Sequence, residues 1–202
     1  MRGRCTRSIL PTMTTRPQRL AHAVANALNP FALFTALFAL VALAEAGVTR
    51  GLLYLVVESA AAAAVTGYVF LLRRLSRVGD FWISTRTERL TPALFLLVAF
   101  VALLVALYFL DAPQDLYLLT LSMALASATV AAITLLWKAS AHCTVAGHAA
   151  VAGVLLLGPI GLIFLLALPL VLYSRVALGA HTLPQTLAGA AVGAGLAVSF
   201  LV

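Results

Sequence analysis

Long apolar stretches are the sequence feature that most constrains the fold of this chain. They cover residues 30–48, 51–72, 93–110, 116–137, 142–157, 160–177 and 184–201. A helix that crosses a bilayer needs about 20 apolar residues, and backbone polar groups inside lipid must be hydrogen-bonded within a helix or a closed barrel. Because the stretches are continuously apolar and do not alternate, we predict an all-α, polytopic transmembrane bundle with about seven spans.

The overall composition excludes an ordinary soluble domain. Of the 202 residues, 63% are hydrophobic and only 9% are charged, whereas a soluble domain is roughly half apolar and about a quarter charged. A chain of this length cannot hide so much apolar surface in one water-facing core. We therefore expect an integral membrane protein whose partners are membrane lipids, with no role for nucleic acid.

The chain divides into two regions, residues 1–28 and 29–202. The first contains five Arg and no acidic residue, and we expect a disordered basic tail close to anionic lipid. The same composition also resembles a transit peptide. The second region is expected to be the transmembrane domain. Its Cys143 is distant in sequence from Cys5, the other cysteine, and we predict no disulfide.

The distribution of cations predicts the orientation. With seven spans, all but one of the 13 Lys and Arg residues lie on one side, and only Arg50 lies opposite. The positive-inside rule places that side in the cytoplasm, and we expect the cell's inner or plasma membrane. Gly-Pro at 158–159 predicts a turn between two short spans. A six-span alternative, with 142–177 continuous, would place two of the polar clusters on opposite sides.

Three polar clusters follow the spans and, in the seven-span arrangement, share one membrane boundary. They are Asp80, Arg86 and Arg89; Lys138, Ser140 and His142; and Ser174, Arg175, His181 and Gln185. Cations close to lipid usually face a cavity or a partner, and forked Arg donors fit phosphate oxygens. The clusters therefore predict a cationic pocket for a phosphate group. Acidic residues are too few there for a metal site, and we expect no cofactor.

The motifs in these clusters resemble the signatures of one family. "SRVALGAHTLPQ" (174–185) resembles the third signature of the type 2 phosphatidic acid phosphatase superfamily, Ser-Arg-x5-His-x3-Asp, which the vanadium haloperoxidases share. "ASAH" (139–142) is similar to the second, Pro-Ser-Gly-His, and "RTERLTP" (86–92) to the first, Lys-x6-Arg-Pro. Trp82 stands where the first signature has Lys, and Lys138 could supply that cation.

The resemblance implies a lipid phosphatase or isoprenoid (di)phosphatase that works through a phosphohistidine. His181 matches the nucleophile and His142 the general acid. Arg175, Arg89 and Ser140 match phosphate-binding groups, to which we add Lys138, Ser174 and Arg86, with Asp80 as a further candidate. The family has Asp at the position of Gln185, which can accept a hydrogen bond from His181 but carries no negative charge.

Two alternatives remain. The chain could bind or process lipid phosphate without hydrolysis, because Gln185 weakens the nucleophile, or it could be a small scaffold or transporter-like protein whose polar clusters only organise helices. The small residues at 188–195 favour close helix packing and would allow a homo-oligomer. His148 is expected to be a packed histidine, and Glu58 has no assigned role although acids inside a membrane are usually functional.

Overall fold

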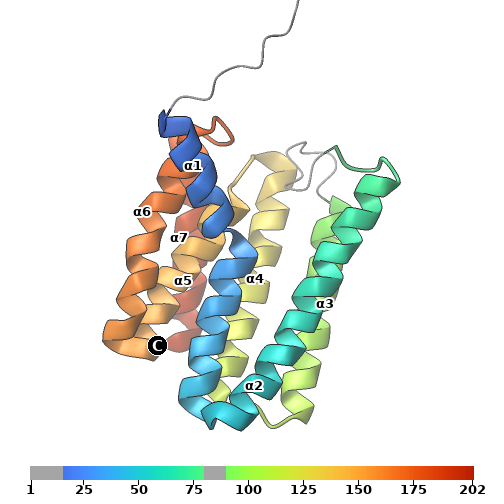
Figure 1. The fold of residues 1–202 in the computed structure, drawn as a ribbon, viewed down its shortest axis with the longest axis vertical. Coiled ribbons are helices and arrows are strands. Elements are labelled where there is room, and N and C mark those ends of the chain that lie inside the picture. The colour runs from blue at the N-terminus through green and yellow to red at the C-terminus, as the bar shows by residue number, and fades with distance from the viewer. Residues whose placement is uncertain (1–15, 80–89) are drawn as a thin grey trace, which may run out of the picture.

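The computed structural model describes residues 16–79 and 90–202, and every regular element in these residues is a helix (Figure 1). The elements are α1 (Arg16–Ala27), α2 (Pro30–Arg74), α3 (Leu90–Phe109), α4 (Gln114–Leu136), α5 (Ala141–Leu157), the short 3-10 helix η2 (Gly158–Gly161), α6 (Leu162–Ala177) and α7 (Leu183–Leu201). The all-α prediction is confirmed for the described part of the chain.

Helix α2 is a hairpin with two arms. Gly47 interrupts it with φ 69° and ψ 179°, a conformation that glycine adopts without steric penalty. In a straight helix Ala42 and Gly51 would lie about 13 Å apart, yet a methyl group on Gly51 would lie 2.9 Å from the Ala42 carbonyl oxygen. The two arms therefore fold back on each other, as the V at the lower end of Figure 1 shows.

Helices α5 and α6 form a second hairpin, joined by η2. A methyl group on Gly161 would collide with the carbonyl oxygen of Gly153, at 1.9 Å. Only glycine at both positions allows the two backbones to approach this closely. The turn at Gly-Pro was expected from the sequence, and the structure confirms it.

Five helical segments in the described residues are long and apolar enough to cross a membrane. This number differs from the seven predicted spans because residues 30–74 and residues 141–177 each count as one segment. Both segments contain a turn, at Gly47 and at η2. The structure therefore supports an integral membrane protein without fixing the number of crossings.

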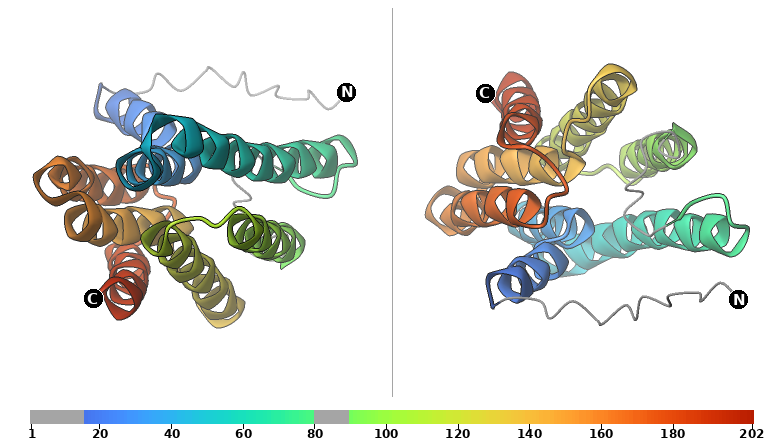
Figure 2. Two further views of the ribbon diagram at one scale, coloured as in Figure 1. Left: turned by 90° about the horizontal axis from the view of Figure 1, so that it is seen from below. Right: turned by 90° about the horizontal axis from the view of Figure 1, so that it is seen from above.

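Helix α5 lies at the centre of the bundle. It packs against α2, α4, α6 and α7, and Figure 2 shows these helices around it. Most of its residues are small, and ten of its 17 are buried. Its closest neighbour is α7, because Gly147 faces Ala190, and Gly193 faces the Thr144 carbonyl. The buried small residues of this stretch, Gly189, Ala190 and Gly193, thus pack within the chain, whereas Ala191 and Gly195 are exposed.

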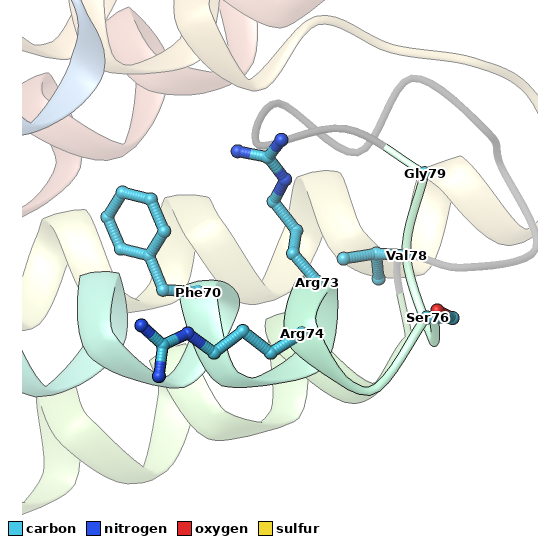
Figure 3. Close-up of a pocket in the computed structure, with 6 residues that line it drawn as sticks. All are labelled: Phe70, Arg73, Arg74, Ser76, Val78 and Gly79. Carbon is cyan, nitrogen blue, oxygen red and sulfur yellow. The ribbon is translucent and has the colours of Figure 1, made fainter.

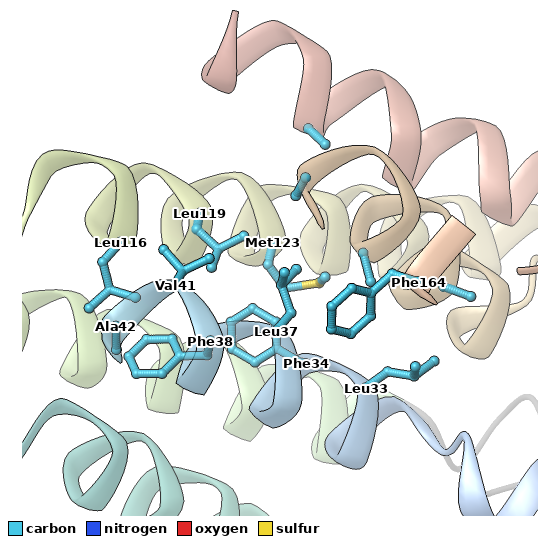
Figure 4. Close-up of a cluster of buried hydrophobic side chains, with 14 of the residues drawn as sticks. Leu33, Phe34, Leu37, Phe38, Val41, Ala42, Leu116, Leu119, Met123 and Phe164 are labelled. Atoms are coloured by element: carbon cyan, nitrogen blue, oxygen red, sulfur yellow. The ribbon is translucent and has the colours of Figure 1, made fainter. Parts of the chain in front are cut away.

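One part of the apolar core lies between the first arm of α2 and helices α4 and α6, and the core continues into α3, α5 and α7. Figure 4 shows side chains from all three helices in one cluster: Leu33, Phe34, Leu37, Phe38, Val41 and Ala42 from α2, Leu116, Leu119 and Met123 from α4, and Phe164 from α6. The α2 residues recur at helical spacing, so one face of this arm is buried. The core holds the first arm of α2 against the rest of the bundle.

Helix α1 corrects part of the prediction for the N-terminus. Residues 16–27 were expected to belong to a disordered tail, but they form a helix that packs against α6. Ala21 and Ala25, one helical turn apart, are buried, while Arg16 and Arg19 are exposed. Small side chains on one face allow this close contact, and Asn29 then caps α2 by accepting from the Ala32 N–H at 3.0 Å. Residues 1–15 lie outside the described part of the chain.

Candidate functional site

The links that carry the second and third predicted clusters lie at one end of the bundle. Helix α1, the end of α2, the α4–α5 link and the α6–α7 link all lie at the upper end in Figure 1, and the C-terminus lies at the other. Residues 138–142 and 174–185 are therefore on the same side, as the sequence predicted. Asp80, Arg86 and Arg89 lie outside the described residues, so the position of the first cluster stays a prediction.

The α4–α5 link places Ser140 at the start of the central helix. Trp137 adopts an extended conformation that ends α4. Ser140 is fully buried and is the N-cap of α5, where its hydroxyl accepts from the Cys143 N–H at 3.4 Å. His142 follows in the first turn and is 8% exposed, and Lys138 is half-buried. A histidine and a capping serine thus sit together at a helix N-terminus, where the helix dipole favours an anion.

The α6–α7 link brings His181 back to the end of α6. The Arg175 carbonyl accepts from the Ala180 N–H at 3.1 Å and from the His181 N–H at 3.2 Å. Gly179, with φ 64°, makes this reversal possible. The backbone therefore fixes the arginine and the histidine of the third cluster beside each other.

The guanidinium of Arg175 is partly buried. Its Nε is buried and has no hydrogen-bond partner among residues 16–79 and 90–202. The side chain also lies within electrostatic range of Cys143, in the first turn of α5. A buried donor without an acceptor is costly, so this nitrogen is well suited to an anionic ligand. Cys143 was expected only as a small core residue, and its position beside Arg175 follows from tertiary packing.

Gln185 has a structural role that the sequence analysis did not assign. Its side-chain Oε1 accepts from the Thr182 N–H at 3.1 Å, and with Thr182 it forms a capping box at the start of α7. We expected this oxygen to orient His181. The pattern Thr-x-x-Gln, followed by an apolar run, is the sequence signature of such a box and could have indicated this role. Gln185 therefore stabilises the helix start.

A backbone hydrogen bond connects the two links. The Ser140 N–H donates to the Gln185 carbonyl at 3.3 Å, and a methyl group on Gly189 would lie 2.5 Å from the Ser140 carbonyl oxygen. The second and third clusters thus meet where α5 and α7 begin. Ser174, which was predicted to bind phosphate, is buried, and its hydroxyl donates to the Val171 carbonyl at 2.8 Å within α6. Its hydroxyl proton is therefore used inside its own helix.

A surface cavity of about 540 Å³ lies at the end of α2. It is lined by Phe70, Arg73, Arg74, Ser76, Val78 and Gly79 (Figure 3). None of these residues was a predicted site residue. The cavity is basic, but its lining includes neither His142 nor His181.

In the described residues, no group of three His, Cys, Asp or Glu side chains is placed to hold a metal ion. His148 is fully buried and its Nε2 lies 2.8 Å from the Ser122 hydroxyl oxygen, so the prediction of a packed histidine is confirmed. Scans of the chain against protein-family models, curated proteins and solved structures find no match.

Proposed function

We propose that the chain is a membrane-embedded phosphatase that hydrolyses a lipid phosphate or an isoprenoid (di)phosphate through a phosphohistidine. The observation that carries the proposal is the backbone connection of the two links. The hydrogen bond from Ser140 to Gln185 and that from His181 to Arg175 bring both histidine-containing motifs to one end of the bundle. The buried Nε of Arg175, which has no hydrogen-bond partner in the described part of the chain, supplies a donor for phosphate there.

The reaction follows from the chemistry of two imidazoles. A ring nitrogen of His181 attacks phosphorus while the bond from phosphorus to the lipid oxygen breaks, and His142 donates a proton to that leaving oxygen. Water then attacks phosphorus, the bond from phosphorus to the ring nitrogen of His181 breaks, His142 accepts a proton from this water, and inorganic phosphate leaves. Arg175 and Lys138 stabilise the charge on the phosphoryl oxygens.

A second candidate function is binding of a lipid phosphate without hydrolysis. The engagement of Gln185 in the capping box favours it, because the amide oxygen is already used by Thr182 and no carboxylate at this position stabilises a charged His181. Loss of the equivalent carboxylate in another histidine-dependent site costs about 10⁴-fold in rate. The phosphatase is therefore expected to turn over slowly.

We also propose seven crossings, with the site on the cytoplasmic side of the inner or plasma membrane. The two hairpins support this number, since each arm would cross once. The concentration of Lys and Arg on the side of the site supports the orientation. Labelling of single cysteines from either side of intact cells tests both: cysteines placed at Gly47 and at Gly179 should react from opposite sides.

The test of function is phosphate release by the full chain in detergent, without added metal. Phosphatidic acid, a prenyl monophosphate and a prenyl diphosphate are supplied to the wild type and to His181→Ala. His22→Ala is the matched control, because His22 is exposed on α1. Release that is lost in His181→Ala and kept in His22→Ala supports the phosphatase, and the best substrate gives the lipid class.

Two other outcomes would contradict hydrolysis. If no substrate releases phosphate but lipid phosphate binds and Arg175→Met abolishes binding, the non-hydrolytic function replaces it. If there is neither release nor binding, the polar links only organise helices, and the scaffold alternative remains.

A further inference from the structure

Glu58 is a buried acid inside the α2 hairpin, away from the phosphate site. It lies in the second arm of α2, eleven residues after Gly47, and is 3% exposed. Thr35 lies twelve residues before Gly47 in the first arm. The fold-back at Gly47 therefore brings these two residues to the same depth.

The carboxyl group uses its two oxygens differently. Oε1 accepts a hydrogen bond from the Thr35 hydroxyl at 2.8 Å, across the two arms. Oε2 is buried and has no hydrogen-bond partner among the residues that the structure describes. The Ser59 hydroxyl is the other polar group close to the carboxyl, and Ser59 is exposed at the surface of the helix.

No charged side chain in the described residues compensates Glu58. Helix α2 packs against α3, α4 and α5, and its first arm shares the apolar core with α6. The titratable side chains on these five helices, besides Glu58, are Glu45, Arg50, Tyr54, Tyr68, Arg73, Arg74, Tyr108, Asp115, Tyr117, His142, Cys143, His148, Tyr173 and Arg175. None of them forms a hydrogen bond or an ion pair with Glu58: Oε1 is bonded to Thr35, and Oε2 has no partner among the described residues.

Three states of this carboxyl can be compared. A carboxylate with one oxygen unpartnered in an apolar span is very costly. A bound metal cation such as Ca²⁺ would need six to eight oxygen ligands, and only two hydroxyls accompany the carboxyl here. A proton on Oε2 removes the charge and leaves Oε1 as the acceptor for Thr35. The remaining cost is one neutral O–H donor without an acceptor, which is far smaller than that of a buried charge.

We propose that Glu58 is a proton-binding site inside the α2 hairpin: a neutral carboxylic acid at neutral pH whose proton on Oε2 exchanges with water. Exchange is expected because Oε2 is not held in a hydrogen bond by any residue that the structure describes. Thr35 positions the group by fixing Oε1. This site is independent of the phosphate chemistry proposed above.

Infrared difference spectroscopy on the full chain in lipid nanodiscs tests the proposal. The spectrum of the wild type minus that of Glu58→Gln at neutral pH should contain a carboxylic acid C=O band, and this band should shift to lower wavenumber in D₂O. Thr35→Val should move the band to higher wavenumber because the hydrogen bond to the C=O is lost, whereas Thr35→Ser should leave it in place. Glu45→Gln is the matched control: Glu45 is exposed on the same helix and should contribute only carboxylate bands.

Carboxylate bands in place of the acid band in the Glu58→Gln difference spectrum would overturn the proposal. An acid band that does not shift in D₂O would also overturn it, because the proton would not exchange. If Glu58→Gln does not fold, the wild type alone decides through a lipid-soluble carbodiimide. A protonated carboxyl adds across one C=N bond of this reagent and gains its full mass, so peptide mapping should find the adduct on Glu58 and not on Glu45. An adduct on Glu58 that forms only after acidification shows a carboxylate at neutral pH, and overturns the proposal.

Discussion

Replacement of Gly193 by alanine tests the close packing of α7 on the central helix. Gly193 is buried against α5, and a methyl group there would lie 1.9 Å from the Thr144 carbonyl oxygen and 2.8 Å from the backbone nitrogen of His148. Ordinary contact begins at 3.4 Å, so the two helices must separate by about 1.5 Å. Both obstacles are backbone atoms, which cannot rotate away as a side chain does.

The expected loss of stability follows from this geometry. Overpacking in a well-packed core costs typically about 1–3 kcal/mol, and the rigid obstacle places Gly193→Ala near the upper end. For a chain of this size each kcal/mol lowers the melting temperature by about 2–4 °C. A decrease of roughly 4–12 °C is therefore expected, and the backbone hydrogen bond from Ser140 to Gln185, already 3.3 Å long, should break.

The assay is thermal denaturation of the purified protein in detergent, followed by tryptophan fluorescence. Gly195→Ala is the matched control, because Gly195 lies on the same helix and a methyl group there meets nothing within 4 Å. This control should be neutral or stabilised by up to about 1 kcal/mol, since glycine is the poorer helix former. Equal melting temperatures for the two variants would refute the close packing of α5 and α7.

Two further substitutions test polar contacts elsewhere in the bundle. Ser122→Ala removes the hydroxyl that lies 2.8 Å from the buried His148 Nε2, and the unpartnered ring nitrogen should lower the free energy of unfolding by about 1–3 kcal/mol. The control Ser199→Ala, at an exposed position of α7, should change it by less than about 0.5 kcal/mol. Equal effects of the two substitutions in denaturant titration would contradict this expectation. Arg50→Met removes the donor of the hydrogen bonds to the carbonyls of residues 110 and 111, at 2.6 and 3.1 Å. The same titration should show that the free energy of unfolding falls by about 0.5–1.5 kcal/mol. An unchanged midpoint would show that this link between α2 and the α3–α4 turn does not stabilise the fold.

The hairpins were predictable because their signals are local. Continuous apolar stretches specify helices in lipid, and Gly-Pro at 158–159 specifies a break. The predicted end of the first span at residue 48 likewise falls beside the kink at Gly47. Helix α1 could not be predicted in the same way, since its alanine face is stabilised only by packing against α6, which is distant in sequence.

The candidate site was predictable in part. The spacing of Arg175 and His181 indicated that both residues belong to one link, and the structure joins them through one backbone hydrogen bond. The sequence could not show that α7 starts against the Ser140 backbone, because this contact depends on Gly189 facing Ser140, which lies 49 residues earlier in the chain. It also could not show the different environments of the two oxygens of Glu58.

The capping box has a consequence for the site as a whole. Because the amide oxygen of Gln185 is bonded to Thr182 and its carbonyl to Ser140, one residue fixes both the first turn of α7 and its contact with α5. Glutamate would keep a capping box and add a negative charge beside His181. The side chain of an aspartate at this position is one methylene shorter, so its carboxylate would lie at different distances from His181 and Thr182. Gln185→Glu therefore separates the two roles. If the missing negative charge beside His181 limits the reaction, phosphate release should become faster while the melting temperature stays unchanged. An unchanged rate in a stable protein would show that residue 185 serves only the start of α7.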